Sequence, residues 1–197
     1  LNSFTLSATQ GGSTLVSLGD ETNYVYRDLR QKQVSVVPGD QITTAVDFAG
    51  RAMHLYLYVD LNQNGQFDAT LNSDGTPTMS GELLAYTYYD GKNSLGETID
   101  GKPGDVAVNA LPAFQLPAML TTGVYRARLK VDWNNIDPAG RWSEEESNKI
   151  DVNGGNVVDF LLNVHRPTHS LKVFTQNGSV NSTDVNGLPD AVPCFQK

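Results

Sequence analysis

Apolar side chains recur at every second position through much of the chain, which is the period of a strand with one buried face. The clearest run covers residues 124–133, where apolar residues from Tyr125 to Trp133 alternate with arginine, lysine and aspartate. Glycine, proline, asparagine and aspartate cluster between such runs and favour turns. The pattern predicts several short strands and almost no helix; the other clear runs are residues 41–48, 54–60 and 156–164.

Short alternating strands separated by turns predict an all-β fold, an antiparallel β-sandwich of the jelly-roll or immunoglobulin-like kind. Two long insertions interrupt the strands, at about residues 68–112 and 134–153. Connections of this length usually carry function or need a brace such as a metal ion. Residues 1–166 are expected to form the sandwich domain.

The composition changes after Arg166, because residues 167–197 contain too little apolar material for a core of their own. We interpret this segment as a hairpin, around Asn177 and Gly178, followed by a polar tail. It would be either the start of a following domain or an edge hairpin that packs on the sandwich.

Composition and charge narrow the classes of protein. The net charge of −8 argues against a nucleic-acid partner, which would need clustered lysine and arginine. No apolar run approaches the roughly 20 residues that span a bilayer. With one cysteine, stability must come from packing or metal rather than from an internal disulfide. We expect a secreted, periplasmic or cell-surface protein whose signal peptide has been removed.

The stretch DLNQNGQFD, residues 60–68, places side-chain oxygens at alternate positions before a glycine. Calcium takes roughly six to eight oxygen ligands, and a tight loop of this kind supplies several of them. The twelfth position of the loop is Leu71 rather than the usual glutamate, so a remote carboxylate, Asp74 or Glu82, would have to complete the site. The ligands expected within the loop are Asp60, Asn62, Asn64, the backbone carbonyl of Gln66, and Asp68.

A second interpretation of this stretch needs no ion. Asn64 and Gly65 would form a type I′ hairpin turn, and Asp60 and Asn62 would simply cap backbone amides. Only two carboxylates lie inside the loop, so the sequence leaves both interpretations open.

A second cluster, at the end of the run 124–133, has the composition of a sugar site. A tryptophan ring packs on the apolar face of a pyranose while amides, acids and arginine read its hydroxyls. Trp133, however, lies in phase with Leu129 and Val131, so the pattern favours the core for its side chain. The candidate ligand-binding residues are Trp133, Asn134, Asp137, Arg141 and Trp142, together with Tyr89 from the tyrosine-rich stretch 85–97.

Signals for catalysis are weak. The sequence has no nucleophile elbow, no H-E-x-x-H motif, no phosphate loop and no dinucleotide fingerprint. His54 is expected to face solvent or a neighbouring tyrosine. The alternative to a binding module is a glycoside hydrolase that uses acids such as Asp132, Asp137 and Glu144.

The order of several segments resembles the GEVED-type β-sandwich modules of large exported bacterial proteins, especially those of Bacteroidetes. The resemblance covers about residues 24–165, and Val158-Asp159-Phe160 stands where the family has its closing Glu-Asp-Tyr. The Gly-Glu-Val-Glu-Asp that names the family is reduced here to Gly155-Asn156-Val157-Val158-Asp159. The segments are YVYRDL, the V-x-P-G-D turn at residues 36–40, LYVDLNQNGQFD, GVYRARLKVDW and GGNVVDFLLNV.

This resemblance implies a non-catalytic accessory module of an exported enzyme or adhesin. We expect a β-sandwich, stabilised by calcium under the metal interpretation, with a glycan-binding, adhesion or spacer role. Its partners would be a glycan or a cell-surface protein, and neighbouring domains of the same chain.

Overall fold

The structure is a computed structural model of the 197-residue chain. It describes residues 1–18, 24–48, 50, 52–73, 76–79, 81–88, 91–99, 111–133, 136–138, 149–166, 171–174 and 180–183. These residues form strands, turns and bends, and no helix is present among them. Accordingly, none of the described segments is a helix long and apolar enough to cross a membrane.

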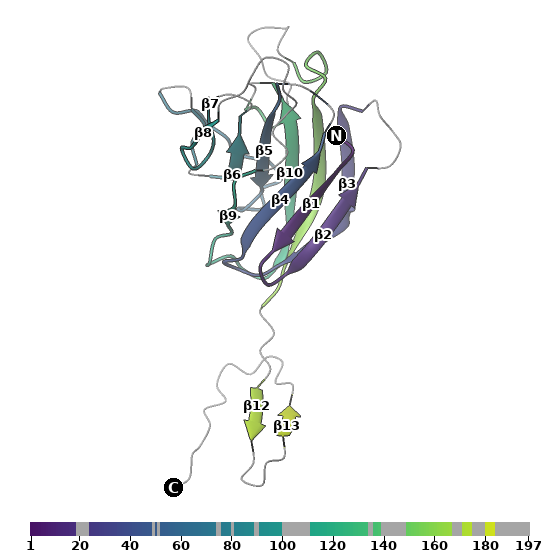
Figure 1. Cartoon of the computed structure of the whole chain (residues 1–197), viewed down its shortest axis with the longest axis vertical. Coiled ribbons are helices and arrows are strands. Elements are labelled where there is room, and N and C mark those ends of the chain that lie inside the picture. The colour runs from purple at the N-terminus through teal and green to yellow at the C-terminus, as the bar shows by residue number, and fades with distance from the viewer. Residues whose placement is uncertain are drawn as a thin grey trace. The chain divides into compact units, whose positions relative to one another are not determined.

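Two sheets form the main body of the protein (Figure 1). The four-stranded sheet has the order β2-β1-β4-β9, and the five-stranded sheet has the order β3-β11-β10-β5-β6. The first sheet contains β1 (Ser3–Ala8), β2 (Gly12–Ser17), β4 (Gln41–Asp47) and β9 (Phe114–Gln115). The second contains β3 (Tyr26–Val36), β5 (His54–Val59), β6 (Leu83–Thr87), β10 (Gly123–Asp132) and β11 (Asn156–Val164).

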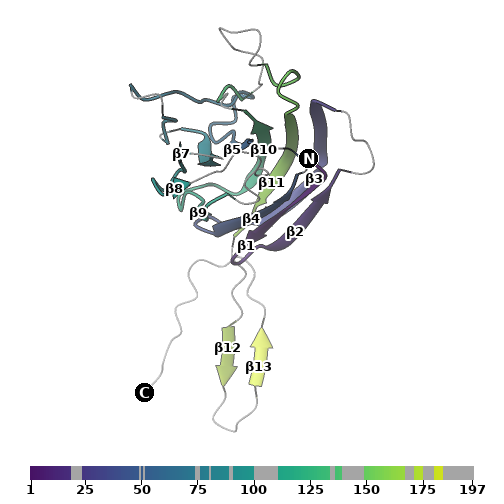
Figure 2. The ribbon, with the colours of Figure 1, turned by 45° about the horizontal axis from the view of Figure 1, so that its top comes forward.

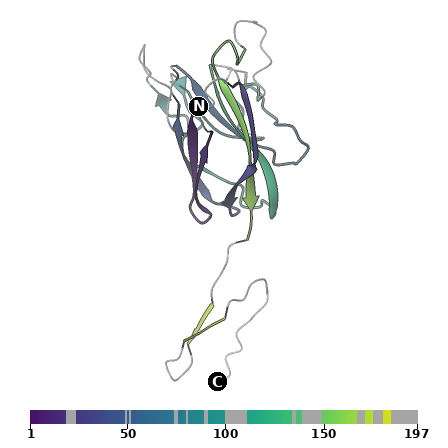
Figure 3. The same ribbon diagram turned by 90° about the vertical axis from the view of Figure 1, so that its right-hand side faces the viewer.

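The two sheets face each other as layers (Figure 3), so the prediction of an all-β sandwich is confirmed. One pairing departs from the expected antiparallel arrangement, because β3 runs parallel to β11. The chain passes from β2 in the four-stranded sheet to β3 in the five-stranded sheet. There β3 lies beside β11, which is distant in the sequence, rather than beside a sequence neighbour. Its residues are largely charged or amide-bearing and mostly exposed. Val34 and Val36 are buried in the core, and partly buried Leu29 packs against it.

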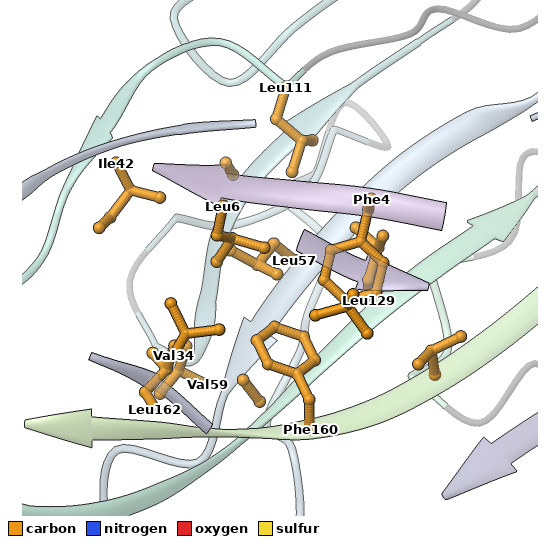
Figure 4. Packing of buried hydrophobic residues seen from close by; sticks show 14 of the residues in the cluster. Phe4, Leu6, Val34, Ile42, Leu57, Val59, Leu111, Leu129, Phe160 and Leu162 are labelled. Carbon is orange, nitrogen blue, oxygen red and sulfur yellow. The ribbon is translucent and has the colours of Figure 1, made fainter. Parts of the chain in front are cut away.

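The hydrophobic core lies between the sheets and follows the period of two. In β10, Tyr125, Ala127, Leu129 and Val131 face inward, as the sequence pattern predicts. Phe4 on β1 meets Phe160 on β11 across the layers, with ring centroids 5.1 Å apart (Figure 4).

The outer face of the five-stranded sheet is also buried at β5. Every residue of β5 is buried, although the period of two leads to an expectation of one exposed face. Tyr56 and Tyr58 belong to a second cluster on this outer face, with Leu83 and Tyr86. Partly buried Phe67, Ala69, Tyr88 and Ile136 pack against it, so both long insertions contribute cover.

Two short pairs of strands complete the described structure. β7 (Gly91–Lys92) pairs with β8 (Thr98–Ile99) and lies on the β5–β6 side of the body, away from β1 and β2 (Figure 2). β12 (Leu171–Phe174) pairs antiparallel with β13 (Val180–Thr183). The chain divides into two compact units, Leu1–His165 and Arg166–Lys197, and the β12–β13 hairpin belongs to the second.

Candidate functional site

The loop at residues 60–68 leaves the end of β5 and is organised by its own side chains. Asp60 is 4% exposed, and its carboxylate accepts hydrogen bonds from the backbone N–H groups of Asn64 (3.1 Å) and Gly65 (2.9 Å). The Oδ1 of Asn62 accepts from Asn64 N–H at 2.9 Å, and the Oδ1 of Asn64 accepts from Gln66 N–H at 2.8 Å. Side-chain oxygens at alternate positions are therefore directed into the loop.

The hairpin-turn interpretation of this loop is wrong in its geometry. A type I′ turn needs positive φ at both central residues, but Gly65 has φ of +84° while Asn64 is not in that region. The positive φ instead occurs at Gln63 (57°). The loop leads into the insertion before β6 rather than joining two strands directly, although Asp60 and Asn62 do cap backbone amides as that interpretation supposed.

Glu82 anchors both ends of the loop. Its side chain accepts hydrogen bonds from Asn62 N–H through Oε1 (3.1 Å) and from Asp68 N–H through Oε2 (2.9 Å), and the residue is 3% exposed. Of the two remote carboxylates suggested by the sequence, Glu82 thus lies against the loop, and Asp74 lies outside the described residues.

Calcium would find oxygen donors of the kind it prefers in this loop. A carboxylate or amide oxygen that accepts one N–H keeps a further lone pair, so the hydrogen bonds of Asp60, Asn62 and Asn64 leave capacity for an ion. Asp68 adds a carboxylate whose Oδ2 is 3.4 Å from Asn62 Nδ2. Within the described part of the chain, no three His, Cys, Asp or Glu side chains form a metal-binding group, so amide and carbonyl oxygens would make up the rest of the ligands.

The polar side chains of β10 converge on a buried acid of the neighbouring strand. Asp159 on β11 is 0% exposed and receives both guanidinium groups of β10. Arg128 donates from Nε to Oδ1 at 2.6 Å and from Nη2 to Oδ2 at 2.9 Å. Arg126 donates to Oδ2 from Nε (3.0 Å) and Nη2 (2.5 Å), and the Tyr26 hydroxyl donates to the same oxygen at 3.0 Å. We call Arg126, Arg128 and Asp159 the arginine clamp.

Two opposed effects set the pKa of Asp159. Burial alone would raise it, but the hydrogen bonds and charge of Arg128, followed by those of Arg126, outweigh burial and lower the pKa below its ordinary value. The carboxylate is therefore ionised at neutral pH and balances one of the two guanidinium charges.

Phe67 connects the loop to the arginine clamp. The guanidinium carbons of Arg126 and Arg128 each lie 4.9 Å from the centre of its ring, which is a cation–π distance. Arg126 also donates from Nη1 to the carbonyl of Gly65 at 3.2 Å. The position of the loop and the position of the clamp therefore depend on each other.

Three side chains of the sheet hold the start of the second insertion by its backbone. The carbonyls of Ile136, Asp137 and Pro138 accept hydrogen bonds from Tyr58 Oη (2.6 Å), Lys130 Nζ (2.6 Å) and Arg128 Nη1 (2.9 Å) respectively. These donors come from the outward faces of β5 and β10, so residues 136–138 lie across that face.

Lys130 and Asp132 form a fully buried ion pair, with Nζ and Oδ2 2.9 Å apart. Burial lowers the pKa of Lys130, and the charge of Asp132 opposes that effect in part. The Oδ1 of Asp132 accepts from Trp133 N–H and from Asn153 Nδ2, each at 2.7 Å. Asp132 is thus an internal structural acid.

A cleft with a volume of about 1070 Å³ opens on the outer face of the five-stranded sheet. Its lining includes the arginines of the clamp and the tip of the loop. Val25 and Tyr26 are 40% and 48% exposed, so an aromatic ring is accessible at its edge. The remaining lining comes from Gly65, Gln66, Phe67, Asp137, Pro138, Lys149, Ile150, Asp151 and Val157.

The ligand-binding residues expected from the sequence do not form one site among the described residues. Of these residues Asp137 lines the cleft, and so does Gln66, which was expected as a metal ligand. Trp133 is 55% exposed, so its expected place in the core is wrong. β10 ends at Asp132, whose side chain caps Trp133 N–H, and beyond that point the period of the strand no longer sets the direction of side chains. Tyr89, Asn134, Arg141 and Trp142 lie outside the described residues, as does the candidate acid Glu144.

The histidine and tyrosines near β6 are structural. His54 is 6% exposed and stacks on Tyr88 with ring centroids 4.2 Å apart, so of its two expected surroundings the neighbouring tyrosine is correct and solvent is not. The ring centroids of Tyr86 and Tyr88 lie 5.3 Å apart. Tyr86 belongs to the second cluster on the outer face of the sheet, and Tyr88 packs against that cluster.

The sequence interpretation missed four residues that line the cleft, namely Tyr26, Phe67, Arg126 and Arg128, and the buried Asp159 that holds the two arginines. One signal was present, because an aspartate within the apolar run VVDFLLNV must find a cationic partner when the strand is buried. Two arginines on the polar face of the other long run were the available partners.

Comparison with known proteins assigns the chain to a family. No curated protein matches the chain. A solved structure of a family 123 glycoside hydrolase from Clostridium perfringens is 12% identical, with a TM-score of 0.25, and the match covers 73% of this chain. The chain spans 23% of the length of that hydrolase. The GEVED domain model matches residues 54–163, from β5 into β11, which includes the loop and the arginine clamp. That match covers more than half of the sequence and agrees with the resemblance of the segments, and the chain belongs to the GEVED domain family.

Proposed function

We propose that this GEVED domain is a non-catalytic accessory module of a larger exported protein and that it binds a glycan in the cleft beside the arginine clamp. The family match favours an accessory module over an enzyme. The observation that carries the binding role is the cleft itself, which joins accessible aromatic surface to many polar groups.

A sugar ring suits this combination of groups. Its apolar face packs on an aromatic ring, and its hydroxyls exchange hydrogen bonds with surrounding polar side chains. Tyr26 presents a half-exposed ring that its hydroxyl holds against Asp159. Gln66 and Asp137 supply an amide and a carboxylate on the same cleft.

One of the acids that the hydrolase alternative needs, Asp132, is buried in the interior. Glycoside hydrolysis needs two carboxyl groups that flank the scissile bond. Asp132 is 0% exposed and is engaged by Lys130, Trp133 and Asn153. A substrate has no access to that carboxylate, and this supports a binding role for the cleft.

We also propose that calcium braces the wall of this cleft. The oxygens of Asp60, Asn62, Asn64 and Asp68 and the backbone carbonyl of Gln66 would hold the ion. Glu82 would position the loop through its two backbone hydrogen bonds rather than act as a ligand. The ion would neutralise the acids of the loop and fix its backbone, and no chemical step depends on it.

A glycan array followed by calorimetry with the glycans that bind tests the binding role. Tyr26→Ala should weaken binding by about tenfold, because the ring face is lost. Tyr26→Phe keeps the ring and should bind nearly as well as the unaltered protein. Leu15→Ala is the matched control, since Leu15 is 64% exposed on β2 of the other sheet. If no glycan on a broad array binds, a spacer role replaces this proposal.

A further inference from the structure

We infer that the ligand of the cleft is an acidic glycan, held through a carboxylate or sulfate group by Arg126 and Arg128. This inference rests on the proposed function, because it names the class of ligand for the same cleft. It follows from the hydrogen bonds and charges that the arginine clamp leaves unused.

The clamp has spare hydrogen-bond donors. A guanidinium group carries five N–H donors and no acceptor. Arg126 uses three, two on Asp159 and one on the Gly65 carbonyl. Arg128 also uses three, two on Asp159 and one on the Pro138 carbonyl. Among the hydrogen bonds of the described residues, two N–H donors therefore remain on each arginine, and both arginines line the cleft.

Asp159 is already engaged by both arginines and by Tyr26. Its Oδ2 already accepts from Arg126 twice, from Arg128 and from Tyr26, and its Oδ1 accepts from Arg128. One carboxylate also balances only one of two guanidinium charges. The clamp thus retains both donors and a positive charge, which are what a second anion needs.

The other charges of the lining determine where the anion would bind. Among the described residues of the lining, Lys149 adds a cation and Asp137 and Asp151 add two acids, so these charges balance those of the clamp once Asp159 is included. The anionic group is therefore expected at the clamp, where the nearest acid, Asp159, is already engaged by both arginines. The remaining acids would face neutral hydroxyls of the sugar.

The aromatic ring lies at a suitable place for an acidic sugar. The guanidinium carbon of Arg128 is 5.8 Å from the centre of the Tyr26 ring, so ring and cation are neighbours. In a uronic or sialic acid the carboxylate is attached directly to the sugar ring. Such a sugar would stack on Tyr26 and place its carboxylate toward the guanidinium groups, whose planar fork matches carboxylate and sulfate geometry.

The first test uses the unaltered protein and paired probes. Oligogalacturonate is compared with its methyl ester, chondroitin sulfate with desulfated chondroitin, and both pairs with neutral galactan, on an array that also holds other acidic and neutral glycans. Every glycan that binds should carry a carboxylate or sulfate. Esterification should weaken binding by about tenfold or more where the carboxylate is recognised, and desulfation should do so where the sulfate is recognised, because desulfated chondroitin keeps its carboxylates. The ester arm identifies carboxylate recognition and the desulfation arm identifies sulfate recognition.

Three outcomes of this array are distinct. Binding confined to acidic glycans supports the inference. Equal binding of neutral glycans or of the esters overturns it and leaves the proposed glycan-binding function intact. Binding of no glycan at all overturns both.

The second test uses variants with the glycan that binds best. Arg126→Gln should weaken binding by about tenfold or more, and Arg126→Lys should give an intermediate loss because charge remains without the fork. Arg30→Gln is a matched control, since Arg30 pairs with Asp28 at the surface and is not part of the cleft. Melting curves confirm folding of each variant. Should Arg126→Gln unfold, a series of salt concentrations with the unaltered protein replaces it, and affinity that does not fall with salt contradicts the inference.

Discussion

Asp159 is a buried residue that fixes the positions of two arginines on the wall of the cleft. Removing one partner of a buried charge network costs far more than the network itself contributes, because the remaining charge stays buried and unpaired. Here the remaining charges would be the guanidinium groups of Arg126 and Arg128, whose side chains are 27% and 10% exposed. The same contacts position both residues on which ligand binding is proposed to depend.

Asp159→Asn should reduce the free energy of unfolding by about 3–5 kcal/mol, since the amide keeps the shape of the side chain but removes its charge. Urea unfolding measures the change. Asp28→Asn is the matched control, because Asp28 forms an exposed pair with Arg30, and surface pairs contribute about 1 kcal/mol or less. A loss no greater than that of the control would show that the clamp is not a stabilising centre.

The lowered pKa of Asp159 also predicts a dependence of stability on pH. Between this lowered folded-state pKa and the ordinary value of about 3.9, the unfolded chain binds more protons than the folded chain. The contribution of Asp159 is thus complete above about pH 4 and is lost as pH falls through its folded-state pKa. The difference between the urea midpoints of the unaltered protein and Asp159→Asn should shrink as pH falls from 6 to 2. A difference that stays constant over this range would contradict the prediction.

At the scale of elements, the period of two predicted four of the strands that face the core and failed where strands end or run along an edge. It was not applied to β1, although Phe4, Leu6 and Ala8 alternate there and are buried. It placed β4, β5, β10 and β11 correctly, because burial on one face fixes alternate residues. It carried Trp133 one residue too far, since a side-chain cap on Asp132 ends β10. It also gave no sign of β3, whose mostly polar residues are ordered by pairing with a distant strand.

The loop at residues 60–68 is the element on which the calcium proposal can be tested. In protein freed of metal by chelation, added calcium should raise the melting temperature. At a hundredfold excess over Kd the stabilisation is about 2.7 kcal/mol, and exported modules often bind with Kd of about 0.1–1 mM. Differential scanning calorimetry with 0–20 mM calcium measures this shift.

Asp68→Asn should largely abolish the shift. It removes a carboxylate that, among the described residues, accepts one long hydrogen bond, from Asn62 Nδ2. Asp47→Asn, at an exposed acid of β4, is the control for the change in charge. The calcium proposal fails if the unaltered protein shows no shift, or if both variants retain it.

For the whole molecule, the class of fold followed from the sequence but the pairing of strands did not. Alternation shows which residues face inward and says nothing of which strand lies beside which. The convergence of Arg126, Arg128 and Asp159 depends on the register of β10 with β11, in which Arg128 faces Asp159 directly. A single sequence does not reveal that register, so the cleft could not be foreseen although its residues were visible.

The division into units predicts how the chain tolerates truncation. The described residues of the main hydrophobic core lie between Phe4 and Val164, within the unit Leu1–His165. A protein that ends at His165 should unfold cooperatively within about 2 °C of the full chain, because it keeps every described residue of that core. Far-UV circular dichroism during heating measures this. A large fall in melting temperature would show that residues 166–197 support the sandwich.

The parallel pairing of β3 with β11 has a consequence for the order in which the protein acquires its structure. Tyr26 and its hydrogen-bond acceptor Asp159 are 133 positions apart in the sequence. During synthesis, β3 leaves the ribosome long before the strand that it will pair with, and the sheet closes only after β11 has followed. Pairing over so long a separation is slow to form. Until then the many charges of β3 keep this unpaired strand soluble, which protects the nascent chain from association with its neighbours.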